Sequence, residues 1–461
     1  MFDRLSRRGF LKGAAATAGV IILSDPLSTR AYAQNKKLTV AYIGVGGQGH
    51  AGWGMSDGQN VAALCDPDEG RMGDMPKKHP EAKIYTDWRK IFDNHKDLNL
   101  VHVATPDHTH FPAAYSAIMR GYPCYCEKPL THSIWEARTL AEVTKQKKVP
   151  TQMGNMGHAN QGNRRIVEWV RSGAIGTIKE IHTWTNRPIW PQGKMGPFKT
   201  AEPPAGFNWD AWIGVAPMKP YFVKDDGKSP VHPFAWRGWF DYGCGAVGDM
   251  GCHTWDSLWW SMDPRAPLSA EPIKVVDLGT DTFPKQMIVK WEFGPSAADS
   301  VFKRPEFTAY WYEGGLKPDV PEEITNDPTR EKKVLPNSGN LYIGTKGKIL
   351  VEGDYGDSPK LIPQAKMDEF KAGDMQKIEK IPASPGHRDE LLKAIRGEEA
   401  WDFPKSNFMY AGPLVEAMNL ANVSVRVGKK LTWDPKNLKC PGCPEADPLI
   451  KREYRKGWWN I

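Results

Sequence analysis

A run of apolar residues that passes directly into closely spaced glycines constrains the fold of this chain most strongly. Residues 38–45 form the run, and Gly44, Gly46 and Gly49 follow the pattern G-x-G-x-x-G. A continuous apolar run predicts a strand buried on both faces, as in a parallel sheet. Glycines at this spacing allow a tight turn, close approach of a pyrophosphate to the backbone, and close packing of the next helix. The stretch therefore predicts the first strand and helix of a dinucleotide-binding domain.

An acidic residue ends the second apolar run. Residues 61–64 precede Asp66, which lies 22 residues after Gly44, close to the spacing of about 20 that places an acid on the ribose of the dinucleotide. Such an acid accepts hydrogen bonds from the ribose hydroxyls and repels a 2′-phosphate, and Pro67 and Asp68 add no cation. We therefore expect NAD in preference to NADP. The alternative is an aspartate that only caps the next helix.

Two further predicted strands end in polar residues. Residues 98–104 precede Thr105, Pro106 and His110, and residues 122–125 precede Glu127-Lys128-Pro129. Open α/β sheets carry their chemistry at these strand ends. A lysine ammonium placed there can polarise a hydroxyl or carbonyl oxygen. The alternatives are a solvated lysine in a turn and, for His110, a helix cap.

A glycine-rich stretch at residues 243–248 leads into Asp249 and His253. A four-residue step places both side chains on one face of a helix. Histidine is suited to removing a hydroxyl proton near neutral pH, and the carboxylate can orient it or share the substrate. As metal ligands the pair would need a third group, which nothing nearby offers, so no metal is expected. As structure, the pair is an aspartate at a helix start with a buried histidine.

Together these motifs resemble the family of glucose-fructose oxidoreductase, inositol dehydrogenase and rhizopine-catabolism proteins (Gfo/Idh/MocA). The resemblance runs from about residue 37 to about residue 433 and rests on residues 44–49, 127–129 and 248–253. It implies that Lys128 polarises the reacting oxygen, that His253 is the base, and that Asp249 binds and orients. At the third strand end this chain carries Asp107 where the family has asparagine. The residues expected at the cofactor are Gly44, Gly46, Gly47, Gln48, Gly49, Asp66, Thr105, Pro106, His110, Glu127 and Lys128.

The hydrophobic pattern changes after about residue 154. Five segments then alternate in polarity or are rich in β-branched and aromatic residues, which predicts a mostly antiparallel sheet; they are residues 178–185, 273–276, 287–293, 307–312 and 341–351. Helices expected at residues 249–260, 388–395 and 413–427 would cover one face of this sheet. The expected fold class is α/β, with an N-terminal Rossmann domain at 36–154, an α/β domain with a mostly antiparallel open sheet at 155–435, and a tail at 436–461.

The second domain has the residue types that a sugar site needs. Sixteen of the 19 tryptophans lie after residue 150, and flat apolar faces with polar groups at the rim suit a sugar. Asn155, His158, Trp236 and Arg237 are candidate substrate contacts, although for Asn155 and His158 an ordinary polar loop role is the favoured interpretation. The segment at residues 191–233, rich in proline, glycine and tryptophan, is expected to be a long ordered excursion.

The first 33 residues predict an export signal. Two arginines, Arg7 and Arg8, precede an apolar run at residues 13–23 and then Ala31-Tyr32-Ala33, as in a twin-arginine signal with its cleavage site. The run is shorter than the roughly 20 residues that span a membrane. We therefore expect a periplasmic or other extracytoplasmic location. Cys440 and Cys443 lack partners at zinc-site spacing, so a local disulfide formed after export is favoured, with a free pair as the alternative.

Removing the signal takes away five basic and two acidic residues, which lowers the formal net charge from +7 to +4. With basic and acidic residues mixed along the chain, neither a nucleic-acid partner nor membrane insertion is expected. Three functions remain: an NAD-dependent oxidoreductase that acts on a sugar or cyclic polyol hydroxyl and retains NAD, an NAD-recycling glycosidase that works by oxidation, elimination and reduction, or a non-catalytic sugar-binding protein. The presence of Lys128, Asp249 and His253 argues against the third. A homo-oligomer formed through the C-terminal sheet is also expected.

Overall fold

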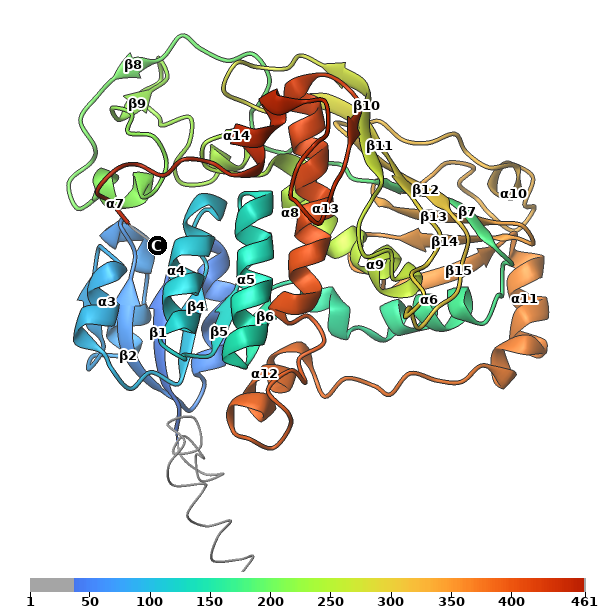
Figure 1. Cartoon of the computed structure of the whole chain (residues 1–461), viewed down its shortest axis with the longest axis horizontal. Coiled ribbons are helices and arrows are strands. Elements are labelled where there is room, and N and C mark those ends of the chain that lie inside the picture. Colours follow the sequence, from blue (N-terminus) through green and yellow to red (C-terminus); the bar gives the residue numbers. More distant parts are fainter. Residues whose placement is uncertain (1–36, 460–461) are drawn as a thin grey trace, which may run out of the picture.

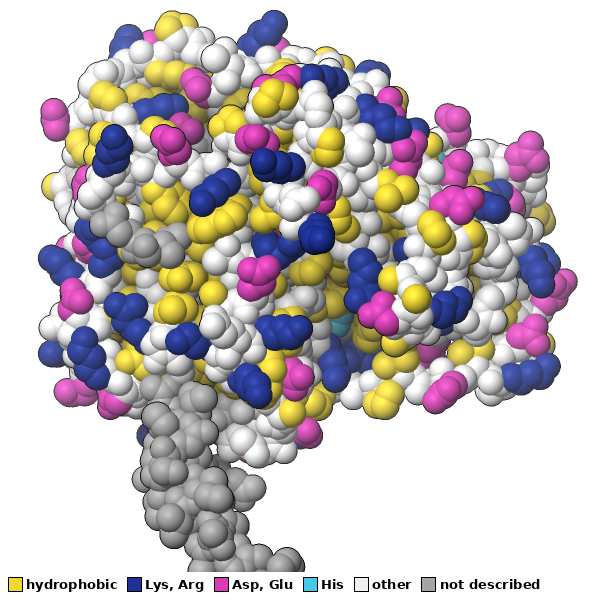
Figure 2. Space-filling model, in the orientation of Figure 1, with side chains coloured by type: hydrophobic (Ala, Val, Ile, Leu, Met, Phe, Trp, Pro, Cys, Tyr) yellow, Lys and Arg dark blue, Asp and Glu magenta, His cyan; other side chains and the backbone are white. Residues whose placement is uncertain are grey.

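The computed structural model describes residues 37–459, which contain two large β-sheets joined by long helices and one small two-stranded sheet (Figure 1). The signal predicted at residues 1–33 lies outside this range. Within it, no helix combines the length and the apolar character that crossing a membrane requires. On the face shown in Figure 2, basic and acidic side chains are interspersed.

The first sheet has six parallel strands in the order β3-β2-β1-β4-β5-β6. In its two central strands every residue except Thr39 is buried, as their continuous apolar runs predict. The order runs outward from β1 in both directions, so the point where it reverses lies between β1 and β4, where open sheets bind their ligands. The strands are β1 (Thr39–Ile43), β2 (Asn60–Cys65), β3 (Lys83–Tyr85), β4 (Leu100–Val103), β5 (Cys124–Cys126) and β6 (Thr151–Met153).

Helices from both halves of the chain cover the first sheet. Helices α4 (Asp107–Met119) and α5 (Ile134–Lys147) pack together on one side, and a capping box between Ser133 and Glu136 begins α5. On the other face, Leu391, Leu392 and Ile395 of α12 (His387–Ile395) share a core with β1 and β2. The expectation that the helix at residues 388–395 covers the second sheet is therefore wrong. Its apolar face packs on the first sheet. The helical spacing of apolar residues predicts that such a face exists but not which sheet it packs against.

The second sheet has eight strands in the order β15-β14-β13-β7-β12-β11-β10-β16. Every pair is antiparallel except β7 with β12, which confirms the prediction of a mostly antiparallel sheet. The strands are β7 (Ile178–Trp184), β10 (Ser269–Val276), β11 (Gln286–Phe293), β12 (Phe307–Glu313), β13 (Gly339–Gly344), β14 (Lys348–Glu352), β15 (Ser358–Ile362) and β16 (Leu431–Thr432).

Three expected elements have different bounds. The strand expected at residues 341–351 is a hairpin, because the chain turns at Gly344–Gly347 between β13 and β14. The helix expected at 249–260 is two helices, α8 (Gly245–Thr254) and α9 (Asp256–Met262). The helix expected from residue 413 is α13 (Phe408–Val427), which starts earlier because the side chain of Asn407 accepts from the amides of Met409 and Tyr410. An asparagine cap is the stronger start signal here than the proline inside the helix.

Helix α13 joins the two halves of the molecule. It packs against α5 and against α8 (Figure 1). Arg138 of α5 donates two hydrogen bonds of 2.7 Å to the carboxylate of Glu416 on α13. On its other side, α13 accepts a hydrogen bond from Trp291 of β11 at the carbonyl of Ala417. These contacts fix the second sheet relative to the strand ends of the first.

The excursion at residues 191–233 is ordered, with short strands β8 (Lys199–Thr200) and β9 (Phe222–Val223), helix α7 (Trp209–Ile213) and its own aromatic core. The tail that follows contains α14 (Asp447–Ile450) and then returns to the first domain, where Trp458 packs on Trp88. Cys440 and Cys443 are buried free thiols, so the disulfide expected between them is not formed. Burial, together with Cys443 and Asp447, raises the pKa of Cys440 to about 12, which keeps this thiol protonated.

Candidate active site

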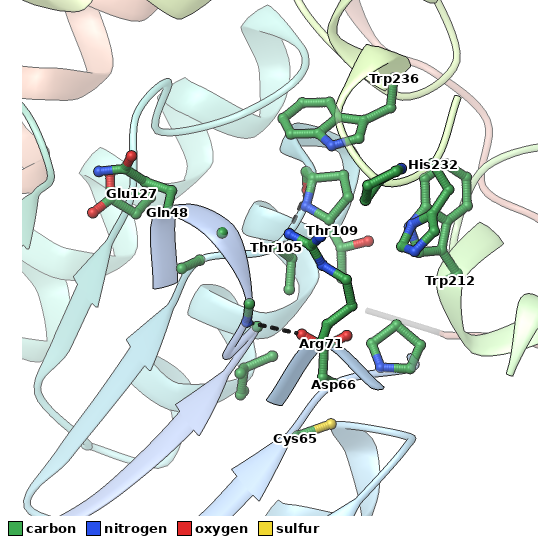
Figure 3. Close-up of a pocket in the computed structure, with 18 of the residues that line it drawn as sticks. Gln48, Cys65, Asp66, Arg71, Thr105, Thr109, Glu127, Trp212, His232 and Trp236 are labelled. Carbon is green, nitrogen blue, oxygen red and sulfur yellow. Dashed lines mark hydrogen bonds between the residues drawn. The ribbon is translucent and has the colours of Figure 1, made fainter. Parts of the chain in front are cut away.

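A cavity of about 400 Å³ lies between the strand ends of the first sheet and the excursion (Figure 3). It brings together most of the residues expected at the cofactor and two of the expected substrate contacts. Gly49, His110, Asn155 and His158 do not line it, and neither do Asp249 and His253. The expected residues that line it are Gly44, Gly46, Gly47, Gln48, Asp66, Thr105, Pro106, Glu127, Lys128, Trp236 and Arg237.

The glycine turn leaves no room for side chains. Gly44 has a φ of +84°, and a Cβ there would lie 2.4 Å from the carbonyl oxygen of Ala104. A Cβ on Gly49 would lie 2.5 Å from the carbonyl oxygen of Gly44. The turn therefore brings the backbone of β1 against β4 and exposes the backbone of the glycines to the cavity.

Asp66 stands at the end of β2 and supports the glycine turn. Its Oδ2 accepts hydrogen bonds of 3.1 Å from the amides of Val45 and Gly46, and its Oδ1 accepts one of 3.1 Å from Asp68. Burial raises the pKa of this carboxyl, while the three amides act in the opposite direction. A carboxylate has about four acceptor positions, so these contacts leave room for a ribose hydroxyl.

Arg71 is a cavity residue that the sequence reasoning missed. It belongs to η3 (Glu69–Met72), just beyond Pro67 and Asp68. Its side chain lies along Gly46 and Gly47, since a Cβ on Gly46 would be 2.9 Å from its Nε and one on Gly47 would be 3.0 Å from Nη2. Figure 3 shows it extending into the cavity from beside Asp66. A cation thus lies where the turn would receive phosphate groups.

Lys128, Asp249 and Arg237 form a charged group at the inner end of the cavity. The Lys128 ammonium donates to Oδ1 and to the main-chain carbonyl of Asp249, both at 2.9 Å, and Arg237 Nε donates to the same Oδ1 at 3.2 Å. Burial opposes the charged form of Asp249, but the two cations outweigh it and lower the pKa of this carboxyl. Burial likewise disfavours the Lys128 ammonium, yet the charge of Asp249 prevails and raises its pKa. Both groups are charged at neutral pH.

His253 follows Asp249 by one helical turn but does not bond to it. The ring is 5% exposed, packs at 4.9 Å against the ring of Tyr355, and its Nδ1 has no partner within the described part of the chain. Burial, followed by the charge of Lys128, lowers its pKa to about 3. The imidazole is therefore neutral across the physiological range. The predicted orienting contact from Asp249 is absent because that carboxylate binds Lys128 and Arg237.

Two buried acids flank the charged group. Burial raises the pKa of Glu127 to about 7, although Lys128 opposes the shift, and its Oε2 is without a partner among the described residues. Asp107 accepts from the amide of Cys244 at 2.9 Å, and burial raises its pKa to about 7 as well. Both carboxyls are poised to change charge near neutral pH.

His110, Asn155 and His158 contact protein groups. His110 bridges the carbonyls of Thr105 and Pro129 at 2.8 and 2.7 Å, which ties the β4 and β5 loops together. Asn155 is fully buried and hydrogen-bonds to Ser406 and Asp256. His158 is also buried, 2.9 Å from the carboxylate of Asp256. These contacts support the loops at the site.

The excursion covers the Asp66 side of the cavity. His232 Nε2 lies 2.8 Å from Asp68 Oδ2, and the amide of Asn208 donates to the carbonyl of Pro67 at 2.7 Å. The rings of Trp212, His232 and Trp236 face into the cavity (Figure 3). Arg237 stacks on Trp236 with its guanidinium 4.2 Å from the ring centre.

These features fit a dinucleotide. Any Cβ would fill the space beside the glycine turn, the carboxylate of Asp66 suits a ribose, and the positive charge of Arg71 suits phosphate. Within residues 37–459 there is no group of three or more histidine, cysteine or acidic side chains that could hold a metal ion.

Comparison with known proteins extends this picture. Residues 38–155 match the NAD-binding Rossmann fold of the Gfo/Idh/MocA oxidoreductase family, and residues 165–291 match its C-terminal α/β domain. The chain is 30% identical over 154 residues to inositol 2-dehydrogenase 4 of Saccharopolyspora erythraea, covering 32% of this chain and 45% of that protein. It is 30% identical over 93 residues to levoglucosan dehydrogenase of Pseudarthrobacter phenanthrenivorans, covering 20% and 24%. Less than half of either relative is matched.

Solved structures share the fold over most of this chain. The WlbA dehydrogenase of Bordetella pertussis, in complex with NADH and UDP-GlcNAcA, covers 87% of this chain and 99% of its own at 13% identity, with a TM-score of 0.57. The aldose-aldose oxidoreductase of Caulobacter crescentus, complexed with glycerol, covers 86% and 100% at 14% identity, with a TM-score of 0.54.

Proposed function

Because the chain belongs to the Gfo/Idh/MocA family of oxidoreductases, we propose that it oxidises a hydroxyl of a sugar or cyclic polyol with NAD. The observation that carries this proposal is the charged lysine at the inner end of the nucleotide cavity. Lys128 is held by Asp249 at 2.9 Å, and a neutral His253 lies on the same helix as that aspartate. A cationic donor and a neutral base near one another are what removal of a hydroxyl proton requires.

Each residue then has a distinct task. The glycine turn would hold the phosphates, with the positive charge of Arg71 beside it, and Asp66 would hold the ribose and disfavour a 2′-phosphate. Bound NAD supplies the two-electron acceptor. Lys128 donates a hydrogen bond to the substrate oxygen and stabilises the negative charge that develops on it. His253 accepts the hydroxyl proton, and Asp249 keeps Lys128 charged and in place.

The sugar or polyol class is supported by two kinds of observation. Two of the relatives that match part of this chain are an inositol dehydrogenase and a levoglucosan dehydrogenase. In this chain, Trp236 and Arg237 place an aromatic face and a charged donor side by side in the cavity, which suits the C–H and O–H groups of a sugar ring.

We further propose that NAD stays bound between turnovers. The excursion contacts the loop that follows Asp66 through Asn208 and His232, so the adenosine side of the cavity has a wall supplied by the second domain. An export signal at residues 1–33 would then carry a loaded enzyme out of the cytoplasm. An enzyme that retains NAD must regenerate it in place, either with a second substrate or in a redox-neutral cycle. The second candidate function is therefore the NAD-recycling glycosidase.

One preparation tests these proposals. Protein purified without added nucleotide and then denatured should release close to one NAD per chain. The native protein should be incubated with free sugars and with aryl glycosides. Sugar conversion without aglycone release supports the oxidoreductase, while aglycone release without net oxidation supports the glycosidase. Substoichiometric NAD, with activity that depends on added NAD, would contradict retention. Conversion of neither substrate panel, with or without added NAD, would contradict both functions.

A further inference from the structure

A second cavity, of about 330 Å³, lies on the far side of the segment that precedes α8, and it shares no lining residue with the first. Its walls come from the last turns of α13, from α14 and the tail, and from the start of α5. The residues that matter most are His132, Asn419, Asn422, Arg426 and Arg452.

Four of the residues that line this cavity carry buried polar atoms without partners. Within the described part of the chain, Arg452 Nη2, His132 Nε2, Asn419 Nδ2 and Asn422 Oδ1 have no hydrogen-bond partner. Asn419 and Asn422 are only 4% and 7% exposed. A buried polar atom left unpaired costs free energy, so several of them on one cavity indicate a missing ligand or solvent.

The existing contacts determine which of these atoms are donors. Arg452 Nη1 lies 2.7 Å from His132 Nδ1, and a guanidinium can only donate. His132 Nδ1 is therefore the acceptor. Burial and the charge of Arg452 lower the pKa of this histidine, so the ring is neutral and its proton is on Nε2. The carbonyl of Phe240 lies near this ring, but Nε2 makes no hydrogen bond of normal geometry.

The two asparagines are oriented in the same way. Asn422 Nδ2 donates to the carbonyl of Cys244 at 2.9 Å and to Asn419 Oδ1 at 3.5 Å. This leaves Asn419 Nδ2 as a free donor and Asn422 Oδ1 as a free acceptor. Three donors from Arg452, His132 and Asn419 thus accompany one acceptor.

The charge at the cavity is positive where these donors lie. Neither Arg426 nor Arg452 forms an ion pair among residues 37–459. Asp241 also lines the cavity, but its carboxylate is paired with Lys219 at 2.6 Å. Glu453 is exposed. Glu136 acts on Arg452 through space, yet it accepts hydrogen bonds from Tyr454 and from the amides of His132 and Ser133.

We propose that this cavity is a second binding site, for a small oxyanion that also carries a hydroxyl, such as a phosphate ester or a hydroxycarboxylate. The anionic oxygens accept from Arg452, His132 and Asn419, and the hydroxyl donates to Asn422. Arg426 stands at the mouth, with its guanidinium 4.4 Å from the ring centre of Phe240, and adds attraction for an anion. This site does not depend on the proposed function.

The segment between the two cavities connects them physically. Gly243 and Cys244 line the second cavity. The amide of Cys244 donates to Asp107 at 2.9 Å, and a Cβ on Gly243 would lie 2.6 Å from the Cα of Arg237. A ligand in the second cavity would therefore contact the segment that supports the Lys128, Asp249 and Arg237 group.

Calorimetric titration of the NAD-saturated full chain with inorganic phosphate and with glycerol 3-phosphate tests the proposal, because NAD blocks phosphate binding in the first cavity. We expect one site per chain with a dissociation constant of about 1 mM or tighter for at least the ester. Arg452→Gln should weaken anion binding tenfold or more because a charged donor is lost. Asn419→Asp should weaken it by a similar factor because the new carboxylate repels the anion. Arg265→Gln removes the same charge from a side chain that is 52% exposed and should leave binding within about twofold.

Several outcomes would overturn the proposal. If neither anion showed saturable binding, water and not an anion would be the hydrogen-bond partner of the unpaired atoms, and the proposal would be wrong. Binding that persists in both Arg452→Gln and Asn419→Asp would place the anion elsewhere. Thermal melting of each variant establishes that it is folded, and the nearly isosteric Asn419→Asp keeps the test valid if Arg452→Gln disturbs the tail.

Discussion

The ammonium of Lys128 is bound to Asp249 twice, by the side-chain Oδ1 and by the main-chain carbonyl, each at 2.9 Å. A lysine with one such contact could swing away, but two acceptors from one residue fix both its position and its charge. The lysine comes from the end of β5 and the aspartate from α8. The site is thus assembled from a strand end of the first sheet and a helix that lies more than 100 residues later in the chain.

Replacing Lys128 tests the charged donor. We expect Lys128→Ala to lower kcat by about 10²- to 10⁴-fold, the usual worth of a positioned acid or base. Bound NAD should remain near the wild-type amount, because the role proposed for this side chain is at the reacting oxygen and not at the dinucleotide. Asp249→Asn should lower kcat less, since the main-chain carbonyl still accepts from the ammonium. Steady-state kinetics with NAD content measured on the same preparations provides the check; more than half the wild-type activity in Lys128→Ala would remove its assigned role.

His253→Ala should reduce kcat by a similar factor of about 10² to 10⁴. The pKa of His253 is lowered to about 3, so the wild-type ring stays neutral down to about pH 4. No loss of kcat between pH 8 and pH 5 should therefore come from protonation of this group. The check is a pH profile of kcat for the wild type and for His253→Gln. If kcat of the wild type fell near pH 6 and kcat of the variant did not, His253 would titrate near pH 6, and burial would not be what sets its pKa.

Asp66 and Arg71 act oppositely on cofactor choice. Asp66 should give the wild type a preference for NAD over NADP of tenfold or more, about 1.4 kcal/mol. Asp66→Ser removes the repulsion while Arg71 stays available to a 2′-phosphate, so NADP binding should tighten. The double variant Asp66→Ser with Arg71→Ala should lose that gain. Dissociation constants for both cofactors across the four proteins measure the effect. Unchanged NADP affinity in Asp66→Ser would contradict the assignment.

Docking of the excursion should slow the release of NAD. His232→Ala removes the 2.8 Å contact with Asp68 and should speed dissociation several-fold. Lys199→Ala, in an exposed pair with Asp225 on the same excursion, is the matched control. Stopped-flow fluorescence of NADH release compares the two. Equal release rates in both variants and the wild type would show that this contact does not hold the nucleotide.

Glu313 should make the fold less stable as the pH rises. It is fully buried, one oxygen accepts from Trp311 at 2.7 Å, and burial raises its pKa to about 8. The folded state therefore keeps a proton that the unfolded state loses near pH 4.5. Stability from this group is complete below that pH and declines up to about pH 8, by about 1.4 kcal/mol per unit at most.

The variant Glu313→Gln is neutral at every pH and should escape this decline. Urea unfolding at pH 5 and pH 8 measures the free energy of unfolding of both proteins. Relative to the wild type, the variant should be more stable at pH 8 than it is at pH 5. Glu399→Gln, at an exposed position, should not. A gap between Glu313→Gln and wild type that is the same at both pH values would contradict the raised pKa.

The strand ends of the first sheet could be predicted because local signals coincide there. The glycine turn, Asp66 and Lys128 each follow an apolar run, and parallel strands bring such ends to one edge. Arg71 could not be found in this way, because it lies in a short helix beyond the strand end and only the folded loop turns it into the cavity. The sequence signal for Arg71 is a cation five residues after Asp66.

Tertiary packing decided what local signals left open. His110 and Asn155 have the polarity of ligand contacts, yet their partners are protein groups from other loops. The helix at α12 has an apolar face that fits either sheet, and only the three-dimensional arrangement assigns it to the first. The second cavity depends on a tail that returns to α5, which no local pattern indicates.

The parallel pairing of β7 with β12 sets the timing of folding during synthesis. Strand β7 ends at Trp184, but its neighbours β12 and β13 end at Glu313 and Gly344. At translation rates of about 5 to 20 residues per second, both edges of this central strand stay unpaired for roughly six to twenty-six seconds, until β12 has been made. Non-local pairing of this kind is slow and exposes strand edges to aggregation. Soluble yield should therefore depend on chaperone supply and growth temperature more than the stability of the finished protein would suggest.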